Sequence, residues 1–178
     1  MTLVLRLIRQ SRWDSPERFE WLGEGDIPAD PLADFANTCE NCLSVWFLDG
    51  KEDLNDIVAA LAAAREKADK LDFMLFAEEH LRTAGIKVRA TTGDTPDAAV
   101  NGRHRDLVQL SAAKVLALTT RVWRENLGCR RIDGRSVVQL VADAVRRGRV
   151  ALQTLRPKLR DEVISSLGDR RDEPRKPR

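Results

Sequence analysis

Two short apolar runs constrain the fold of this chain more than any other feature. Residues Cys42 to Leu48 and Phe73 to Ala77 are almost entirely apolar. Such short continuous runs are typical of strands buried on both faces. Between them, an Asp49-Gly50 turn signal precedes a stretch up to Lys70 whose apolar residues recur at helical spacing. The order strand, helix, strand predicts a right-handed βαβ unit with two parallel neighbouring strands.

Two further segments of the first half have strand character. Apolar and other residues alternate from Thr2 to Gln10, with Leu3, Leu5 and Leu7 on one side and Val4, Arg6 and Ile8 on the other. Ile86 to Thr91 predicts another strand. The fold class we expect is therefore α/β, with α+β as the alternative, built on a small mixed sheet that is mainly parallel.

From Asp106 onward the apolar spacing changes and predicts helices only. We expect helices over 106–125, 136–147 and 150–167, the last interrupted by Pro157. These would form a bundle packed on the sheet. The predicted organisation is a sheet region over 1–105, a helical region over 106–168 on the same core, and a charged flexible tail over 169–178. The residues that we expect in the core are Trp46, Phe73, Leu75, Leu116 and Leu118.

The net charge of +2 conceals a strong polarity along the chain. Residues 1–100 contain 11 Lys and Arg against 19 Asp and Glu, whereas residues 101–178 contain 19 against 9. One interpretation is a basic docking surface on the C-terminal helices for an anionic partner. Its candidate residues are Arg146, Arg147, Arg149, Lys158 and Arg160. The other interpretation is that the acidic and basic parts pair with each other, within the chain or between copies of it.

An enzymatic alternative follows from the predicted parallel sheet. Ligands of open parallel sheets bind beyond the carboxyl ends of the strands. Asp49, Glu78 and His80 follow predicted strands there, and His104 belongs to a nearby polar cluster. If these groups converged, they could hold Mg²⁺ or Mn²⁺ for hydrolysis of a phosphoester, as in a nuclease. The competing interpretation is that they are ordinary capping residues of loops.

The polar cluster itself spans Asn101 to Asp106. It begins like the catalytic loop of protein kinases at His104-Arg105-Asp106, but the other kinase motifs are missing and the chain is too short for that fold. Arg103 and Arg105 are candidate anion-binding residues, because guanidinium groups suit phosphate. The alternative is a helix N-terminus capped by Asp106.

Neither the cysteines nor the hydropathy pattern indicates a special class of protein. Cys39 and Cys42 have the Cys-x-x-Cys spacing, but they precede a strand rather than open a helix, and no second pair could complete a zinc site. We therefore expect no metal and no cofactor, and reduced thiols. No apolar segment is long enough to span a membrane, and Arg6 and Arg9 interrupt the first apolar run, so we expect a cytoplasmic protein.

The functional hypothesis from the sequence is a non-enzymatic interaction protein. It would be a small subunit or adaptor of a bacterial intracellular assembly, bound to a protein partner or to a second copy of the chain through the basic C-terminal helices. The metal-dependent phosphoesterase remains an alternative, and so does binding of nucleic acid through the same basic helices.

Overall fold

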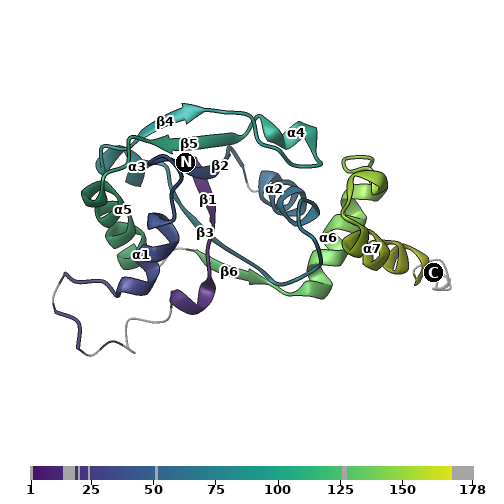
Figure 1. Ribbon diagram of the computed structural model, residues 1–178, viewed down its shortest axis with the longest axis horizontal. Helices are drawn as coiled ribbons and strands as arrows, with labels where there is room; N and C mark the ends of the chain where they lie inside the picture. The colour runs from purple at the N-terminus through teal and green to yellow at the C-terminus, as the bar shows by residue number, and fades with distance from the viewer. Residues whose placement is uncertain are drawn as a thin grey trace, which may run out of the picture. The chain divides into compact units, whose positions relative to one another are not determined.

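The computed structural model describes residues 2–13, 19, 21–23, 25–50, 52–125 and 128–169 (Figure 1). They belong to two compact units. The sheet unit is drawn from Met1–Lys51, Asp72–Gly93 and Arg103–Arg131, and the helical unit from Glu52–Leu71, Asp94–Gly102 and Ile132–Arg178. The predicted C-terminal tail lies, apart from Asp169, outside the described residues.

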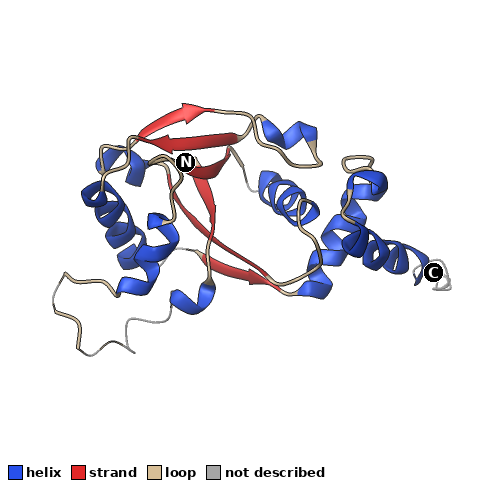
Figure 2. Ribbon diagram, in the orientation of Figure 1, coloured by secondary structure: helices blue, strands red, loops and turns tan. Residues whose placement is uncertain are grey.

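The sheet unit is built on a six-stranded sheet with the order β4-β5-β2-β1-β3-β6 (Figure 2). The strands are β1 (Leu3–Leu7), β2 (Leu43–Leu48), β3 (Leu71–Ala77), β4 (Lys87–Ala90), β5 (His104–Val108) and β6 (Cys129–Ile132). Strand β1 is central and pairs antiparallel with both β2 and β3. Strand β5 pairs antiparallel with β2 and β4.

The prediction of a mainly parallel sheet is wrong, because the sheet is antiparallel. The two apolar runs do form strands, and both contain buried side chains. They are not neighbours, however: β1 lies between β2 and β3, with Leu5 opposite Trp46 on one side and Leu75 on the other. The apolar composition of a strand reports its burial and carries no information about which strand lies beside it.

One face of the sheet is covered by α1 (Ala29–Ala36), α3 (Glu79–Thr83) and α5 (Ala112–Glu125) (Figure 1). The alternation of β1 directs Val4 and Ile8 to this face, where they join a buried apolar cluster. The same cluster contains Phe35 of α1, Leu81 of α3 and Leu118 of α5.

The prediction of one long helix over 106–125 is also wrong for the first part of that range. Residues 104–108 form β5, which has a paired strand on each side, and Gln109 then takes a left-handed backbone conformation with φ 55°. Helix α5 begins only at Ala112. Of the expected core residues, Trp46, Phe73, Leu75 and Leu118 are buried, whereas Leu116 is 47% exposed because α5 is covered on one face only. Pairing within the sheet thus overrides the local helical spacing.

The helical unit contains α2 (Glu52–Ala63), α4 (Ala98–Asn101), α6 (Gly134–Arg146) and α7 (Pro157–Asp169), with a short 3₁₀ turn over Leu152–Thr154. Helix α6 packs against α2 and α7. Helix α2 ends at Ala63, short of the predicted Lys70. Pro157 does not kink a helix: it opens α7, where a missing backbone N–H costs nothing.

Small side chains bring the helices of this unit together. Ala59, Ala60 and Ala63 of α2 are buried, as are Val137 and Val141 of α6. Leu159 and Val163 form the buried stripe of α7. Among the described residues, no helix combines the length and the hydropathy needed to cross a membrane.

Candidate functional site

The four groups of the predicted strand-end site do not gather at one place. Asp49 forms an ion pair with Arg103, and Glu78 is exposed at the start of α3. His80 is buried in α3, stacked on Phe76, with its Nε2 2.7 Å from a carboxylate oxygen of Glu125. Within the described part of the chain, no three His, Cys, Asp or Glu side chains are placed to hold one metal ion.

His104 lies in β5 on the other face of the sheet from His80. Its ring contacts Trp46 edge-on at 5.1 Å, and its Nδ1 is 2.7 Å from the hydroxyl of Thr91. Trp46 alternates with Val45, which faces the covering helices. Burial lowers the pKa of His104 below its ordinary value; the carboxylate of Asp106 opposes this shift, and Arg105 adds to it. His104 is therefore neutral near pH 7.

The two candidate anion-binding arginines have partners within the sheet unit. Because this segment is a strand, the helix N-terminus expected at Asp106 does not exist there. Arg103 pairs with Asp49. Arg105 donates to the carbonyl of His104 at 2.7 Å, and its guanidinium lies over the ring of Phe47. These contacts hold β5 against β2.

Three of the five predicted partner-binding residues form ion pairs inside the helical unit. Arg146 pairs with Asp143 one turn earlier in α6. Arg147 and Arg149 both reach Asp56 of α2, at 3.0 and 2.8 Å. Lys158 and Arg160 of α7 make no side-chain ion pair or hydrogen bond with any described residue.

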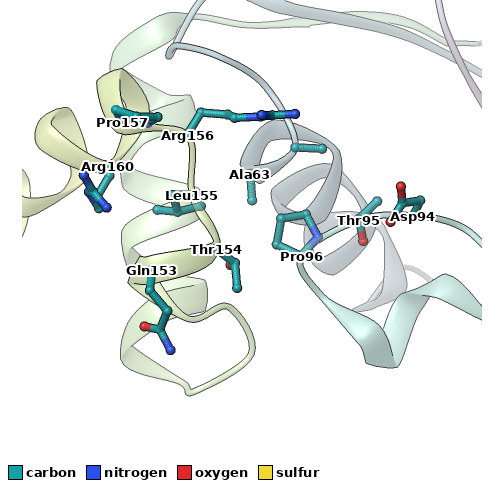
Figure 3. A pocket seen from close by; sticks show the side chains of 11 residues that line it. Ala63, Asp94, Thr95, Pro96, Gln153, Thr154, Leu155, Arg156, Pro157 and Arg160 are labelled. Atoms are coloured by element: carbon teal, nitrogen blue, oxygen red, sulfur yellow. The ribbon is translucent and has the colours of Figure 1, made fainter.

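Arg156 and Arg160 border a pocket of the helical unit with a volume of about 530 Å³ (Figure 3). Figure 3 shows Arg156 extending from the start of α7 toward Ala63 of α2. Asp94, Thr95 and Pro96 lie across the pocket from Gln153 and Thr154. The polar and charged residues that line it are Asp94, Thr95, Gln153, Thr154, Arg156 and Arg160. The remaining lining residues are alanine, proline and leucine.

The electrostatics of this pocket are set by its two arginines. Arg156 has only a long contact of 3.9 Å with Glu66, and both side chains are mostly exposed, at 64% and 77%. An exposed pair at this separation contributes little. Arg160 follows one turn later, on α7, so two planar donors border one hollow whose lining is partly polar and partly apolar. This arrangement can bind a carboxylate with an apolar neighbour.

The sequence indicated only part of this site. Arg160 is among the residues that the sequence predicts, but Arg156 is not. Thr95 and Asp94 reach the pocket from a loop about sixty residues earlier in the chain, and local patterns carry no signal for that approach.

The cysteines occupy unrelated positions. Cys39 and Cys42 face each other across a two-residue turn, joined by two backbone hydrogen bonds of 3.1 and 2.8 Å. Glu40 and Asn41 take left-handed conformations there, as a tight hairpin requires. Burial, together with Asp72, raises the pKa of the Cys129 thiol to about 11. That thiol is therefore a poor nucleophile.

No family model, no curated protein and no solved structure matches this chain.

Proposed function

We propose that the chain is a non-enzymatic protein-binding module that takes an acidic segment of a partner protein into the pocket of the helical unit. The observation that carries this proposal is the pair Arg156 and Arg160. They border a hollow of about 530 Å³, and the only ion pair that either forms with a described residue is the 3.9 Å contact of Arg156 with Glu66, whereas Arg146, Arg147 and Arg149 pair closely with Asp143, Asp56 and Asp97. Among the five predicted docking residues, those without an ion pair to a described residue are therefore Lys158 and Arg160, both on α7.

The pocket chemistry favours an acidic protein segment over nucleic acid. Two guanidinium groups are opposed by the carboxylate of Asp94, which leaves a single positive charge among the lining residues. Grooves for nucleic acid carry many more cations, and those for single strands add aromatic side chains on which bases stack. The lining contains no aromatic residue. One or two carboxylates flanked by small apolar side chains fit it better.

The enzymatic alternative gains no comparable support. It needs a carboxylate and imidazole cluster. Asp49 and Glu78 instead follow the ends of β2 and β3, whereas His80 and His104 lie on opposite faces of the sheet. Binding without catalysis therefore agrees best with the geometry.

A charge-reversal experiment tests the proposal. The probe is a fluorescein-labelled peptide rich in glutamate and leucine, and binding is measured by fluorescence anisotropy at fixed ionic strength. The double variant Arg156→Glu/Arg160→Glu should weaken binding about tenfold or more, as removal of desolvated charge pairs does. Acidic residues suit the first turn of a helix, so the variant should remain folded.

Lys158→Glu is the matched control, because Lys158 lies between the two arginines on α7 and does not line the pocket. It should bind the peptide within about twofold of wild type if the arginines act through local contacts rather than through net charge. Equal losses of peptide affinity in the double variant and in Lys158→Glu would contradict binding at this pocket. Failure of the wild-type protein to bind the acidic peptide, with tight binding of a single-stranded oligonucleotide instead, would favour the nucleic-acid alternative.

A further inference from the structure

A second concentration of arginines lies in the sheet unit, where Arg6 occupies an unusual position in β1. The alternation of the strand places it on the same face as Val4 and Ile8, which belong to the buried apolar cluster. Its guanidinium donates to two backbone carbonyls, those of Ser44 at 3.0 Å and Asp34 at 3.3 Å. Its Nε is buried and has no hydrogen-bond partner among the residues that the structure describes.

Asp34 is the carboxylate nearest to this charge, but its oxygens are already occupied. Oδ1 accepts from Arg12 at 2.7 Å. Oδ2 accepts from the backbone N–H of Arg9 at 3.1 Å and from the indole N–H of Trp13 at 2.9 Å. Besides its two backbone acceptors, Arg6 has the electrostatic attraction of Asp34 but no hydrogen bond to that carboxylate. Burial therefore lowers the pKa of Arg6, and Asp34 opposes that shift without cancelling it.

A pocket of about 540 Å³ opens beside these groups, lined by Arg6, Arg9, Arg12 and Asp34 together with Asn37. The side chain of Arg9 is exposed and forms no ion pair or hydrogen bond with the described residues. Three guanidinium groups against one carboxylate leave two positive charges at the pocket. A partly buried cation with a free N–H is costly unless a counterion completes its shell.

We infer that this pocket binds the phosphate group of a small phosphate monoester, with Arg6 and Arg9 as its donors and Arg12 as a residue positioned by Asp34. A doubly charged phosphate matches the net charge of +2 on the charged residues that line the pocket, and the planar forks of arginine suit its oxygens. The volume leaves room for a small organic group, since ligand pockets commonly measure about 300–1,000 Å³. This site is separate from the proposed protein-binding pocket and shares no residue with it.

Titration calorimetry at pH 8 tests the inference with glycerol 3-phosphate as the probe. At this pH the monoester carries two negative charges, since its second pKa is about 6. Wild-type protein should bind one equivalent, whereas glycerol, which lacks the phosphate, should not bind. Sodium acetate at matched ionic strength should compete poorly, because a monoanion leaves one charge uncompensated.

Arg9→Ala should weaken binding of glycerol 3-phosphate at least tenfold while leaving the melting temperature of the free protein unchanged, because its exposed side chain forms no hydrogen bond or ion pair with the described residues. Arg130→Ala is the control: Arg130 is exposed in β6 and does not line the pocket, so its affinity should equal that of wild type. The inference is overturned if wild-type protein shows no saturable binding, or if the two variants lose affinity equally. Neither result bears on the proposed protein-binding pocket, because that proposal is tested with another probe and with variants of other residues.

Discussion

The guanidinium of Arg149 lies 2.9 Å from the carboxylate of Asp97, a residue 52 positions earlier whose side chain is only 3% exposed. Asp97 also caps α4 by accepting from the backbone N–H of Ala99 at 3.0 Å. Arg149 reaches Asp56 of α2 as well. The acidic and basic segments of the sequence therefore meet within the helical unit at this point. Through its two ion pairs, Arg149 connects its own segment with α2 and with the start of α4.

Removal of the Arg149 side chain should destabilise the protein. Arg149→Ala leaves the buried carboxylate of Asp97 without its cation, and loss of one partner of such a pair typically costs about 3–5 kcal/mol when fully buried. Because Arg149 is partly exposed, we expect about 2–3 kcal/mol by urea denaturation. Arg135→Ala, on the exposed side of α6, should change the free energy of unfolding by less than about 0.5 kcal/mol. Equal stability of the two variants would show that the ion pair is dispensable.

The two leucines Leu116 and Leu118 of α5 should differ strongly in how much their truncation destabilises the protein. Leu118 is buried in the apolar cluster of the sheet unit, and Leu118→Ala should cost about 2–5 kcal/mol through lost burial and a cavity. Leu116 is about half exposed, so Leu116→Ala should cost less than about 0.5 kcal/mol. Denaturant unfolding of both variants measures the difference. A larger loss for Leu116 would mean that another molecule or segment covers that face.

Much of the secondary structure was predictable from the sequence, and the reasons are local. The apolar runs mark β2 and β3 because buried strands need apolar side chains on both faces, and the alternation marks β1. The direction and order of the strands were not predictable: insertion of β1 between β2 and β3 depends on long-range pairing that leaves no trace in the composition of either run.

The candidate sites were predictable only in part. Lys158 and Arg160 have no ion-pair partner among the described residues, whereas the ion pairs of Arg147 and Arg149 depend on α2 being packed beside α6. The pocket with Arg6, Arg9 and Arg12 had a visible signal, a spacing of one arginine every three residues. That spacing was interpreted only as an interruption of an apolar run, because nothing local indicates that Asp34 approaches it.

The stability of the protein should depend on the protonation of His104. Its pKa in the folded state is lowered by burial, so the folded state binds the proton less readily than the unfolded chain, whose value is about 6.5. The contribution of neutral His104 is fully present above that unfolded value and is lost as the pH falls toward the folded one. The free energy of unfolding should fall between pH 7 and pH 5, and His104→Gln should reduce this dependence.

Proton NMR titration provides the direct check on that shift. The chain has two histidines, so comparison with His104→Gln assigns the signals. A His104 pKa above the ordinary value would contradict the effect of burial and would reverse the predicted direction of the stability change.

The measurement that tests the central claim most directly is NMR mapping of the acidic peptide on ¹⁵N-labelled protein. The account predicts that saturating peptide shifts the amide signals of Thr95, Thr154, Arg156 and Arg160, which surround the pocket of the helical unit, and leaves those of Arg103 and Arg105 in β5 unchanged. Shifts confined to the sheet unit, or spread evenly over every exposed basic residue, would contradict it.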